Sequence, residues 1–406
     1  MWRSSAVIGG SNEKNNIVKS VQICLLWLFC LLFPLSPVSA GDPLTLRIAL
    51  YEPVPDQERF RKAIRDEWSA RHPDIPLEFA DWSCYGHDPT DDLDVFVYDA
   101  MYFDKYLDQG WLLPLADDEI ENREDLIPFA LEACTAGGTV YSIPEFLCAD
   151  FLFTRRDDAA MPEVDTIPEL FEVLGTVGTE DVPFQENDGL LVNLSTKSFL
   201  FTWYFQALAD AEQADAADLL PVDPDQLSRE AYDSLAMIRK MTGLAQMTWK
   251  PENGDEYARG ESFAHGYGRA FIGPSENMGL MGDEAENMDL RLFSMTDDSN
   301  IPYFYADHAA VNANIRPDKR ALAVELLNVI TGTKVMVSAC SPAASGENYQ
   351  YLLPARISAY DELGKMDPVY EQFRVLAVDP EARIYAISYE DLKSLSENEL
   401  LMSLLK

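Results

Sequence analysis

Apolar and polar residues in the first third of the chain alternate with periods that predict strands and helices in turn. Within 57–71 the apolar residues Phe60, Ile64 and Trp68 recur every four positions, which is typical of a helix with one buried face. We expect strands at 44–51, 76–82 and 93–98 and a second helix at 102–109. Such alternation predicts a mixed or parallel sheet covered by helices, which binds ligands beyond the carboxyl ends of its strands.

The rest of the chain continues this alternation into a second unit. Thr166, with Glu169 three positions later, has the spacing of a capping box at the start of a helix. We expect strands at 151–154 and 269–272 and helices at 193–208, 228–241, 255–265 and 320–332. The segments 180–188 and 209–225 are predicted to be loop or surface helix. No repeat or Pro-rich linker separates the two units, so we expect a soft boundary between them.

The first forty residues have the pattern of a secretory signal. Arg3, Lys14 and Lys19 precede an apolar run of 13 residues at 23–35, and small residues follow as far as Ala40. A helix that spans a membrane needs about 20 apolar residues, so an uncleaved anchor fits this run less well. We therefore predict cleavage after Ala40 and a mature chain that is secreted or periplasmic, with no membrane attachment afterwards.

The composition is strongly acidic, which limits the partners that the chain can attract. The 69 Asp and Glu residues outnumber the 31 Lys and Arg residues, and the formal net charge is −38. This charge excludes a sequence-independent grip on nucleic acid phosphates and favours a cationic or neutral ligand. Hydrophobic residues make up 47% of the chain, which is enough for one large core or two of medium size, and we expect two lobes.

Cysteine and histidine positions give no support for a metal site. Removal of the signal leaves four cysteines in an oxidising compartment, where an even number favours disulfide pairing. These cysteines are Cys84, Cys134, Cys148 and Cys340. Their spacings contain no CxxC pair, and the histidines form no HExxH motif, so we expect no metal site.

Three segments in the second half of the chain, at 263–273, 320–332 and 351–356, resemble extracellular solute-binding proteins. This resemblance implies an α/β fold of two hinged lobes of mixed sheet and helices, of the type II periplasmic-binding-protein-like kind, with the ligand in the cleft. The chain of such proteins crosses between the lobes more than once. We expect a monomer with a first lobe at 41–146 and 300–360 and a second lobe at 147–299 and 361–406.

Four further segments narrow the resemblance. Residues 81–89, 94–100, 141–153 and 268–278 resemble thiaminase I, the thiamine pyridinylases, with comparable spacing over nearly the whole mature chain. In that family the cysteine after the Ile-Pro segment is the nucleophile, and the glutamate after the Gly-Arg-Ala strand is its base. The resemblance therefore implies these roles for Cys148 and Glu276, and the transfer of the pyrimidine half of thiamine to an organic base or thiol.

A cysteine and a glutamate also suit this reaction on chemical grounds. A thiolate that adds to the pyrimidine ring and leaves after the exchange divides one hard displacement into easier steps. A thiol with an ordinary pKa of about 8.5 needs a neighbouring base, which a partly buried carboxylate can be. Both residues also have structural interpretations. Cys148 can be a buried apolar side chain or half of a disulfide, and Glu276 a helix N-terminal residue whose pKa the helix dipole lowers.

If Cys148 is a free thiol, the other three mature cysteines permit one bridge and leave one over. We expect Cys84 or Cys134 in that bridge and Cys340 in a core helix. Two other functions stay open. One is a binding protein for thiamine or a related pyrimidine, which does no chemistry, and the other is a cysteine hydrolase with water as the acceptor.

The resemblance to thiaminase I also implies an aromatic and acidic cleft. Aromatic faces suit a flat pyrimidine and a thiazolium cation, and carboxylates offset the charge or accept hydrogen bonds. The predicted substrate residues are Tyr51, Tyr85, Asp94, Asp99, Tyr257, Tyr305 and Asp307. Taken singly, each also fits a strand end, helix face, cap or turn. Pro274 stands where the family would have an aromatic residue, so one stacking contact is expected to differ.

Overall fold

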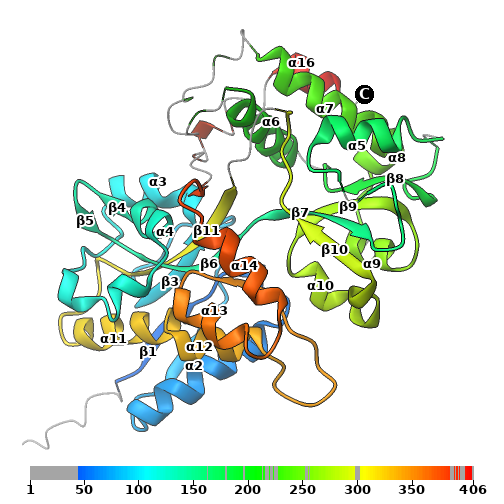
Figure 1. Cartoon of the computed structure of the whole chain (residues 1–406). Helices are drawn as coiled ribbons and strands as arrows, with labels where there is room; N and C mark the ends of the chain where they lie inside the picture. The colour runs from blue at the N-terminus through cyan, green and yellow to red at the C-terminus, as the bar shows by residue number, and fades with distance from the viewer. Residues whose placement is uncertain are drawn as a thin grey trace, which may run out of the picture. The chain divides into compact units, whose positions relative to one another are not determined.

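The computed structural model describes most of the chain that follows the predicted signal (Figure 1). The described residues are 44–161, 163–178, 181–194, 197–212, 214, 219, 223, 227–251, 255, 257–297, 302–384, 388, 390–391, 393 and 398–404. The predicted signal, with its cleavage site after Ala40, and most of 209–225 lie outside them. Within the described residues, no single helix is long and apolar enough to cross a membrane, and one bent pair, Arg320–Ile330 with Thr333–Cys340, meets that criterion by length and composition.

A sheet of seven described strands forms the larger part of the fold. Its order is β12 (Leu353–Pro354), β6 (Ile143–Cys148), β11 (Tyr303–Val311), β3 (Val95–Asp99), β1 (Leu46–Ala49) and β2 (Leu77–Phe79), with β13 (Arg383–Ile384) paired to β11. β1 runs parallel to β2 and β3, whereas β11 is antiparallel to both β3 and β6. The carboxyl ends of β1, β3 and β6 therefore meet the first half of β11 at one edge of the sheet.

Both faces of this sheet are buried, which explains the nearly continuous apolar run of β3. Val95 and Val97 face the main core, and Phe96 and Tyr98 face a second core on the other side. The main core lies under α2 (Gln57–Arg71), α4 (Pro128–Ala133), α11 (Arg320–Ile330), α12 (Thr333–Cys340), α13 (Ile357–Leu363) and α14 (Val369–Ala377). The second core includes residues of α3 (Phe103–Asp108).

A smaller sheet has the order β10 (Met288–Arg291), β7 (Asp150–Arg155), β9 (Gly268–Pro274) and β8 (Glu186–Val192). One face packs on apolar residues of α5 (Ile167–Leu174), α6 (Lys197–Glu212), α7 (Arg229–Thr242) and α16 (Glu399–Ser403). The other face carries Phe153 and Phe271, which pack with Phe263 of α9 (Ala258–Ala264). The chain passes from β6 of the larger sheet to β7 of the smaller sheet through one residue, the buried Ala149.

The remaining elements are short. They are η1 (Ala100–Tyr102), η2 (Asp117–Glu119), η3 (Arg123–Asp125), β4 (Thr135–Ala136), β5 (Thr139–Val140), α8 (Leu244–Met247), α10 (Asn277–Leu280) and η5 (Gly282–Asn287).

Local sequence signals agree closely with the helix starts. The helix predicted at 57–71 is α2, with the Asp56 side chain accepting a hydrogen bond from the amide of Arg59 at 3.0 Å. The capping box of Thr166 and Glu169 is present at the start of α5. The segment predicted as loop or surface helix at 180–188 differs, because it contains the start of β8. Asn187 and Gly189 there have positive φ angles of 51° and 77°, which interrupt the alternation of a strand.

The boundaries of the two predicted lobes stay predictions. Residues 361–384, however, pack with the larger sheet. β13 pairs with β11 of the larger sheet, and residues of α14 belong to its main core. Only the last described residues, in α16, pack against α6. Assignment of the whole of 361–406 to the second lobe therefore differs from the observed packing.

Candidate active site

A cavity of about 470 Å³ is lined by residues from both sheets. Eight of the nine predicted site residues line it, although they are spread from position 51 to position 307 of the sequence. These eight are Tyr51, Tyr85, Asp99, Cys148, Tyr257, Glu276, Tyr305 and Asp307. The fold thus brings the proposed nucleophile and base into one cavity, together with the aromatic and acidic residues expected around them.

Strand β11 positions much of this set. Tyr305 lies opposite Cys148 of β6, and Asp307 lies opposite Asp99 of β3. Because β3 and β6 both end at this edge of the sheet, the thiol and the Asp99 carboxylate stand on either side of β11. No strand was predicted at 303–311, so these two cross-strand pairs were found only in the structure.

A β-bulge lies beside Asp307. Ala306 pairs with Leu147 and His308 with Pro144, so two residues of β6, Glu145 and Phe146, oppose Asp307. Glu145 is 1% exposed, and neither of its carboxylate oxygens has a hydrogen-bond partner among the described residues. Burial raises the pKa of Glu145 to about 8. Burial and then the charges of Glu145, Asp99 and Glu276 hold the pKa of Asp307 well above its ordinary value. This part of the site is therefore rich in carboxyl groups that resist ionisation.

A chain of hydrogen bonds orders the tyrosine side of the cavity. The Tyr85 hydroxyl donates to Asp99 Oδ2 at 2.7 Å, and the amide of Met101 donates to Asp99 Oδ1 at 2.9 Å. The Tyr51 and Tyr85 hydroxyls lie 2.5 Å apart. Since Tyr85 gives its only proton to Asp99, Tyr51 donates to Tyr85. Their rings are 6.0 Å apart and tilted by 54°, which leaves two fixed aromatic surfaces at the cavity.

Cys148 differs from the other described cysteines. It is partly exposed and lines the cavity, whereas Cys84, Cys134 and Cys340 are buried. Burial raises the pKa of each of these three thiols to about 12. None of these four described cysteines forms a disulfide, so the expected disulfide involving Cys84 or Cys134 is wrong. Cys84 lies in a different core from Cys134 and Cys340, while Cys340 does belong to the core helix α12.

Glu276 reaches the cavity from the smaller sheet. It follows β9 by two residues, is 5% exposed, and occupies the N-cap of α10. The Ser275 hydroxyl oxygen lies 3.4 Å from Glu276 Oε2 and 2.7 Å from the carbonyl oxygen of Tyr351. α10 has only four residues, so the dipole considered in the sequence analysis is that of a single turn.

Asp94 is the predicted site residue that does not line the cavity. It lies immediately before β3 and is 5% exposed, and its Oδ2 accepts hydrogen bonds from the Arg47 amide at 2.8 Å and from Lys319 Nζ at 2.7 Å. β3 separates Asp94 from Asp99, so Asp94 lies at the opposite edge of the sheet. Its expected contact with the substrate therefore differs from its observed position.

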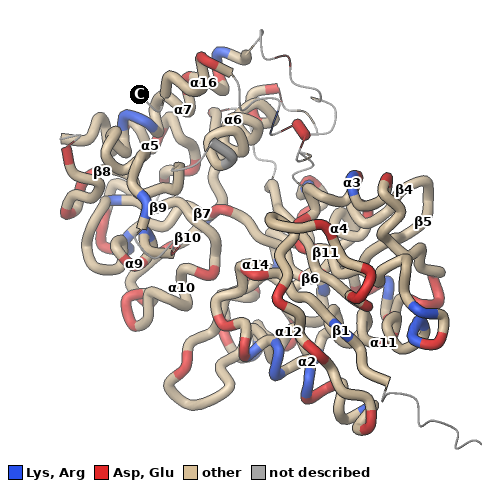
Figure 2. Tube along the Cα trace, turned by 180° about the vertical axis from the view of Figure 1, so that it is seen from behind, with Lys and Arg blue, Asp and Glu red and all other residues tan. Residues whose placement is uncertain are grey.

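The cavity is lined by more acidic than basic side chains, which suits a cationic ligand. Of the described lining residues, Asp99, Asp150, Glu276 and Asp307 are acidic and only Arg259 is basic. The Arg259 guanidinium lies 4.9 Å from the centre of the Trp249 ring and donates to the Trp249 carbonyl at 3.1 Å. Basic residues gather elsewhere, most clearly along α2, which carries five of them (Figure 2).

Asp150 and Arg259 are lining residues that the sequence analysis missed. Asp150 carries a usable signal, because it lies two positions after Cys148 at the start of a predicted strand. Arg259 is a lone basic residue within a predicted helix, and nothing in the local pattern marks it. Among the described residues, no group of three or more His, Cys, Asp or Glu side chains is arranged to hold a metal ion.

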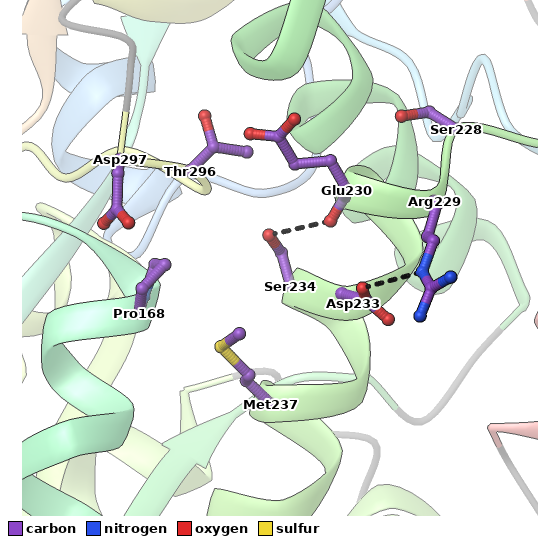
Figure 3. A pocket seen from close by; sticks show the side chains of 9 residues that line it. All are labelled: Pro168, Ser228, Arg229, Glu230, Asp233, Ser234, Met237, Thr296 and Asp297. Carbon is purple, nitrogen blue, oxygen red and sulfur yellow. Dashed lines mark hydrogen bonds and ion pairs between the residues drawn. The ribbon is translucent and has the colours of Figure 1, made fainter.

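A second cavity, of about 580 Å³, lies beside α7 and the start of α5 (Figure 3). Its described lining includes no predicted site residue, cysteine or aromatic side chain. Arg229 forms an ion pair with Asp233 at 3.5 Å, and the Ser234 hydroxyl donates to the Glu230 carbonyl at 3.2 Å within the same helix. These groups are paired with one another, so the cavity that contains Cys148 and Glu276 is the better candidate for an active site.

Comparisons with known proteins show which family this chain resembles. The profile of the Thiaminase-1 domain matches residues 149–296. Thiaminase-1 of Paenibacillus thiaminolyticus is 38% identical over 389 residues, which cover 94% of this chain and 93% of that protein. The structure of Clostridium botulinum thiaminase I in complex with thiamin is 36% identical, with a TM-score of 0.84 over 89% of this chain and 99% of that one.

More distant structures share the fold alone. A solute-binding protein of an ABC transporter from Thermotoga lettingae is 14% identical, with a TM-score of 0.66 over 89% of this chain and 93% of that one. The expected α/β fold of periplasmic-binding-protein-like type is therefore confirmed. With the relatives above at 36% and 38% identity over most of both chains, this chain belongs to the thiaminase I family.

Proposed function

We propose that this chain degrades thiamine by replacing its thiazole with an organic base or a thiol, and that Cys148 is the nucleophile. One observation carries the proposal: a partly exposed thiol shares a cavity with the Glu276 carboxylate and with ordered tyrosines and acidic residues. The family membership supports the same substrate, since a related enzyme was solved in complex with thiamin.

The first step is formation of the thiolate and its addition to the pyrimidine ring. Glu276 accepts the Cys148 proton, which can then pass to a ring nitrogen of the pyrimidine as sulfur adds to the adjacent ring carbon. The near burial of Glu276 supports this role, because a carboxylate with little access to water competes better for a proton. Addition of sulfur removes the aromatic character of the ring and raises the electron density beside the methylene group.

The second step is departure of the thiazole. Electrons from the ring form an exocyclic carbon–carbon double bond as the carbon–nitrogen bond to the thiazolium breaks, so a cation leaves as a neutral heterocycle. The excess of carboxyl groups around the cavity supports binding of the cationic substrate. The faces of Tyr51 and Tyr85, fixed by hydrogen bonds to each other and to Asp99, suit stacking against its flat rings.

The third step is attack of the acceptor on the exocyclic methylene carbon. The electron pair of the double bond returns to the ring, the bond to sulfur breaks, and Cys148 is regenerated. Cysteine and carboxylates supply the nucleophile and the proton transfers in this scheme, and no added cofactor takes part. We extend the proposal to a monomeric, exported enzyme of the transferase class.

The direct test is incubation of the protein with thiamine and pyridine, with the exchange product followed by mass spectrometry. We expect a product in which pyridine has replaced the thiazole. In parallel, an alkylating reagent should label Cys148 and thiamine should slow the labelling. Intact thiamine after prolonged incubation with protein that binds it would overturn the enzymatic proposal and leave a binding protein.

A further inference from the structure

Asp150 stands beside the proposed nucleophile without a role in the scheme above. It is the first residue of β7, lines the cavity, and is separated from Cys148 by Ala149 alone. Across the smaller sheet it pairs with Pro274, two residues before Glu276. Asp150 is therefore two residues from Cys148 along the chain and lies opposite a residue two positions before Glu276, and all three line the same cavity.

The surroundings of Asp150 set it apart from the other cavity carboxylates. Among the described residues, its side chain has neither a hydrogen-bond donor nor an ion-pair partner, whereas Asp99 accepts two hydrogen bonds. Burial raises the pKa of Asp150 to about 7, close to neutral pH. The negative charges of Asp150 and Cys148 both add to the effect of burial in raising the pKa of Tyr305. Asp150, Cys148 and Tyr305 therefore occupy the same corner of the cavity.

The exchange reaction contains one proton transfer that Glu276 does not account for. The thiol proton passes through Glu276 to the pyrimidine ring and returns when sulfur leaves, so it ends where it began. Pyridine brings no N–H proton and becomes a cation in the product. A primary amine or a thiol instead brings one proton that the product does not keep. That proton needs an acceptor of its own at the moment when the new bond forms.

We propose that Asp150 is a second acid–base residue, which receives the proton of an incoming amine or thiol. In this step the acceptor atom bonds to the methylene carbon, and the electron pair of the exocyclic double bond shifts into the ring. The carbon–sulfur bond breaks with its electron pair on Cys148, and the acceptor proton passes to the Asp150 carboxylate and then to solvent. This inference rests on the proposed function.

The other cavity carboxylates suit this role less well. Asp307 holds its proton, because burial and the neighbouring acids raise its pKa well above the ordinary value. Asp99 is engaged by the Tyr85 hydroxyl and the Met101 amide. A carboxylate whose pKa lies near neutral pH can both accept a proton during the reaction and release it afterwards, and Asp150 has this property.

The test compares two aromatic bases of similar size, pyridine, which has no N–H proton, and aniline, whose NH2 group loses one of its two protons in the product. The quantity to measure is kcat/KM for the acceptor at saturating thiamine, which reports the second half of a reaction with a covalent intermediate. For Asp150→Asn we expect a fall of about 100-fold or more with aniline and a change of less than about threefold with pyridine. Asp157→Asn, in the exposed turn after β7, is the matched control and should change neither value.

Other outcomes have distinct meanings. An equal loss with both acceptors, or no loss with aniline, would overturn the role of Asp150. Asp150→Glu restores a carboxylate, so it should recover at least about tenfold of the aniline activity lost in Asp150→Asn; failure to do so in a folded protein would also count against the role. If the unsubstituted protein exchanges neither acceptor, the proposed function itself fails, and that result is independent of Asp150.

Discussion

The two ends of strand β3 carry the same residue type in opposite settings. Asp94, at the amino end, is buried and accepts hydrogen bonds from Lys319 Nζ and the Arg47 amide. Asp99, at the carboxyl end, lines the cavity and accepts hydrogen bonds from a tyrosine hydroxyl and an amide. One carboxylate is neutralised by a lysine within the fold, and the other has no cationic partner among the described residues.

The same difference extends along the two edges of the larger sheet. At the amino edge, Arg47 also forms ion pairs with Asp92 and Glu78. At the carboxyl edge, no ion pair within the described residues reaches Asp99, Glu145, Asp150 or Asp307. Charges paired inside the fold serve stability, whereas carboxyl groups left unpaired beside a cavity are available to a cationic ligand. The predictions below test this division.

The largest effect is expected from Cys148→Ser at the carboxyl edge. A hydroxyl is a far weaker nucleophile than a thiolate near neutral pH, so turnover should fall by about 10⁴-fold or more, while thiamine binding stays measurable by calorimetry. Cys134→Ser is the control, because Cys134 is a free thiol in the buried core. Cys134→Ser should lower the melting temperature and leave the turnover rate of the folded protein unchanged. Comparable turnover in Cys148→Ser would show that sulfur is not the nucleophile.

The carboxyl groups that have no ion-pair partner beside the cavity should make the ligand-free protein less stable at high pH. The pKa of Glu145 is raised to about 8, whereas a glutamate in the unfolded chain has a pKa of about 4.3. The folded chain therefore holds the proton over a range in which the unfolded chain has lost it, and stability falls as pH rises through this window. Between pH 5 and pH 8, Glu145 should lower the free energy of unfolding by about 3.5 kcal/mol.

Urea unfolding at several pH values measures this slope. Glu145→Gln should reduce it by the share that Glu145 supplies, whereas Glu132→Gln, at an exposed position of α4, should leave it unchanged. Asp150, with a pKa of about 7, adds a slope of the same sign. Stability that rises from pH 5 to pH 8 in the unsubstituted protein would contradict the comparison of the two edges.

At the amino edge, Asp94→Asn should reduce stability and spare activity. The substitution leaves Lys319 without its buried partner, which should lower the free energy of unfolding by about 2 kcal/mol. kcat/KM for thiamine should not change. Asp117→Asn removes the exposed ion pair with Arg123 and serves as the control, with an expected loss below about 1 kcal/mol. A tenfold fall in kcat/KM at unchanged stability would place Asp94 with the substrate after all.

The smallest effect is expected for Tyr85→Phe. This change removes the hydroxyl that joins Tyr51 to Asp99 but keeps the aromatic face. Loss of one hydrogen bond to a carboxylate should cost about 1 kcal/mol, or about a fivefold rise in KM for thiamine, with kcat nearly constant. Tyr267→Phe, at a partly exposed position outside the cavity lining, should have no effect. An unchanged KM in Tyr85→Phe would mean that stacking alone fixes the substrate.

Elements whose signals are local could be predicted from the sequence. The apolar spacing of α2 and the capping box of α5 are contained within one or two turns, and the structure has both. β11 was missed because Asp307 and His308 interrupt its apolar pattern, and because its partner β3 lies some two hundred positions earlier in the chain.

The candidate site divides in the same way. Residue type and family resemblance indicated eight residues that line the cavity, although their roles remain proposals. The direction of β3 explains why Asp94 does not line the cavity. A residue that precedes this strand lies at the end of the sheet opposite to the end where Tyr51 and Asp99 lie. An even number of cysteines suggested a disulfide, but only the folded chain shows that Cys84 lies in a different core from Cys134 and Cys340. The setting of Asp150 depends on Pro274, a cross-strand neighbour more than a hundred positions away.

The passage of the chain through Ala149 has a mechanical consequence. Residues two positions apart cannot separate by more than about 7 Å, so Cys148 and Asp150 keep their spacing however the sheets move. Glu276 has no such short tether to Cys148, since it is carried by β9 of the smaller sheet. Any rotation about this pivot would change the distance from thiol to Glu276 and leave the distance from thiol to Asp150 almost constant. With the proposed roles, substrate entry would control when Glu276 takes the thiol proton, while Asp150 would stay beside the sulfur throughout the cycle.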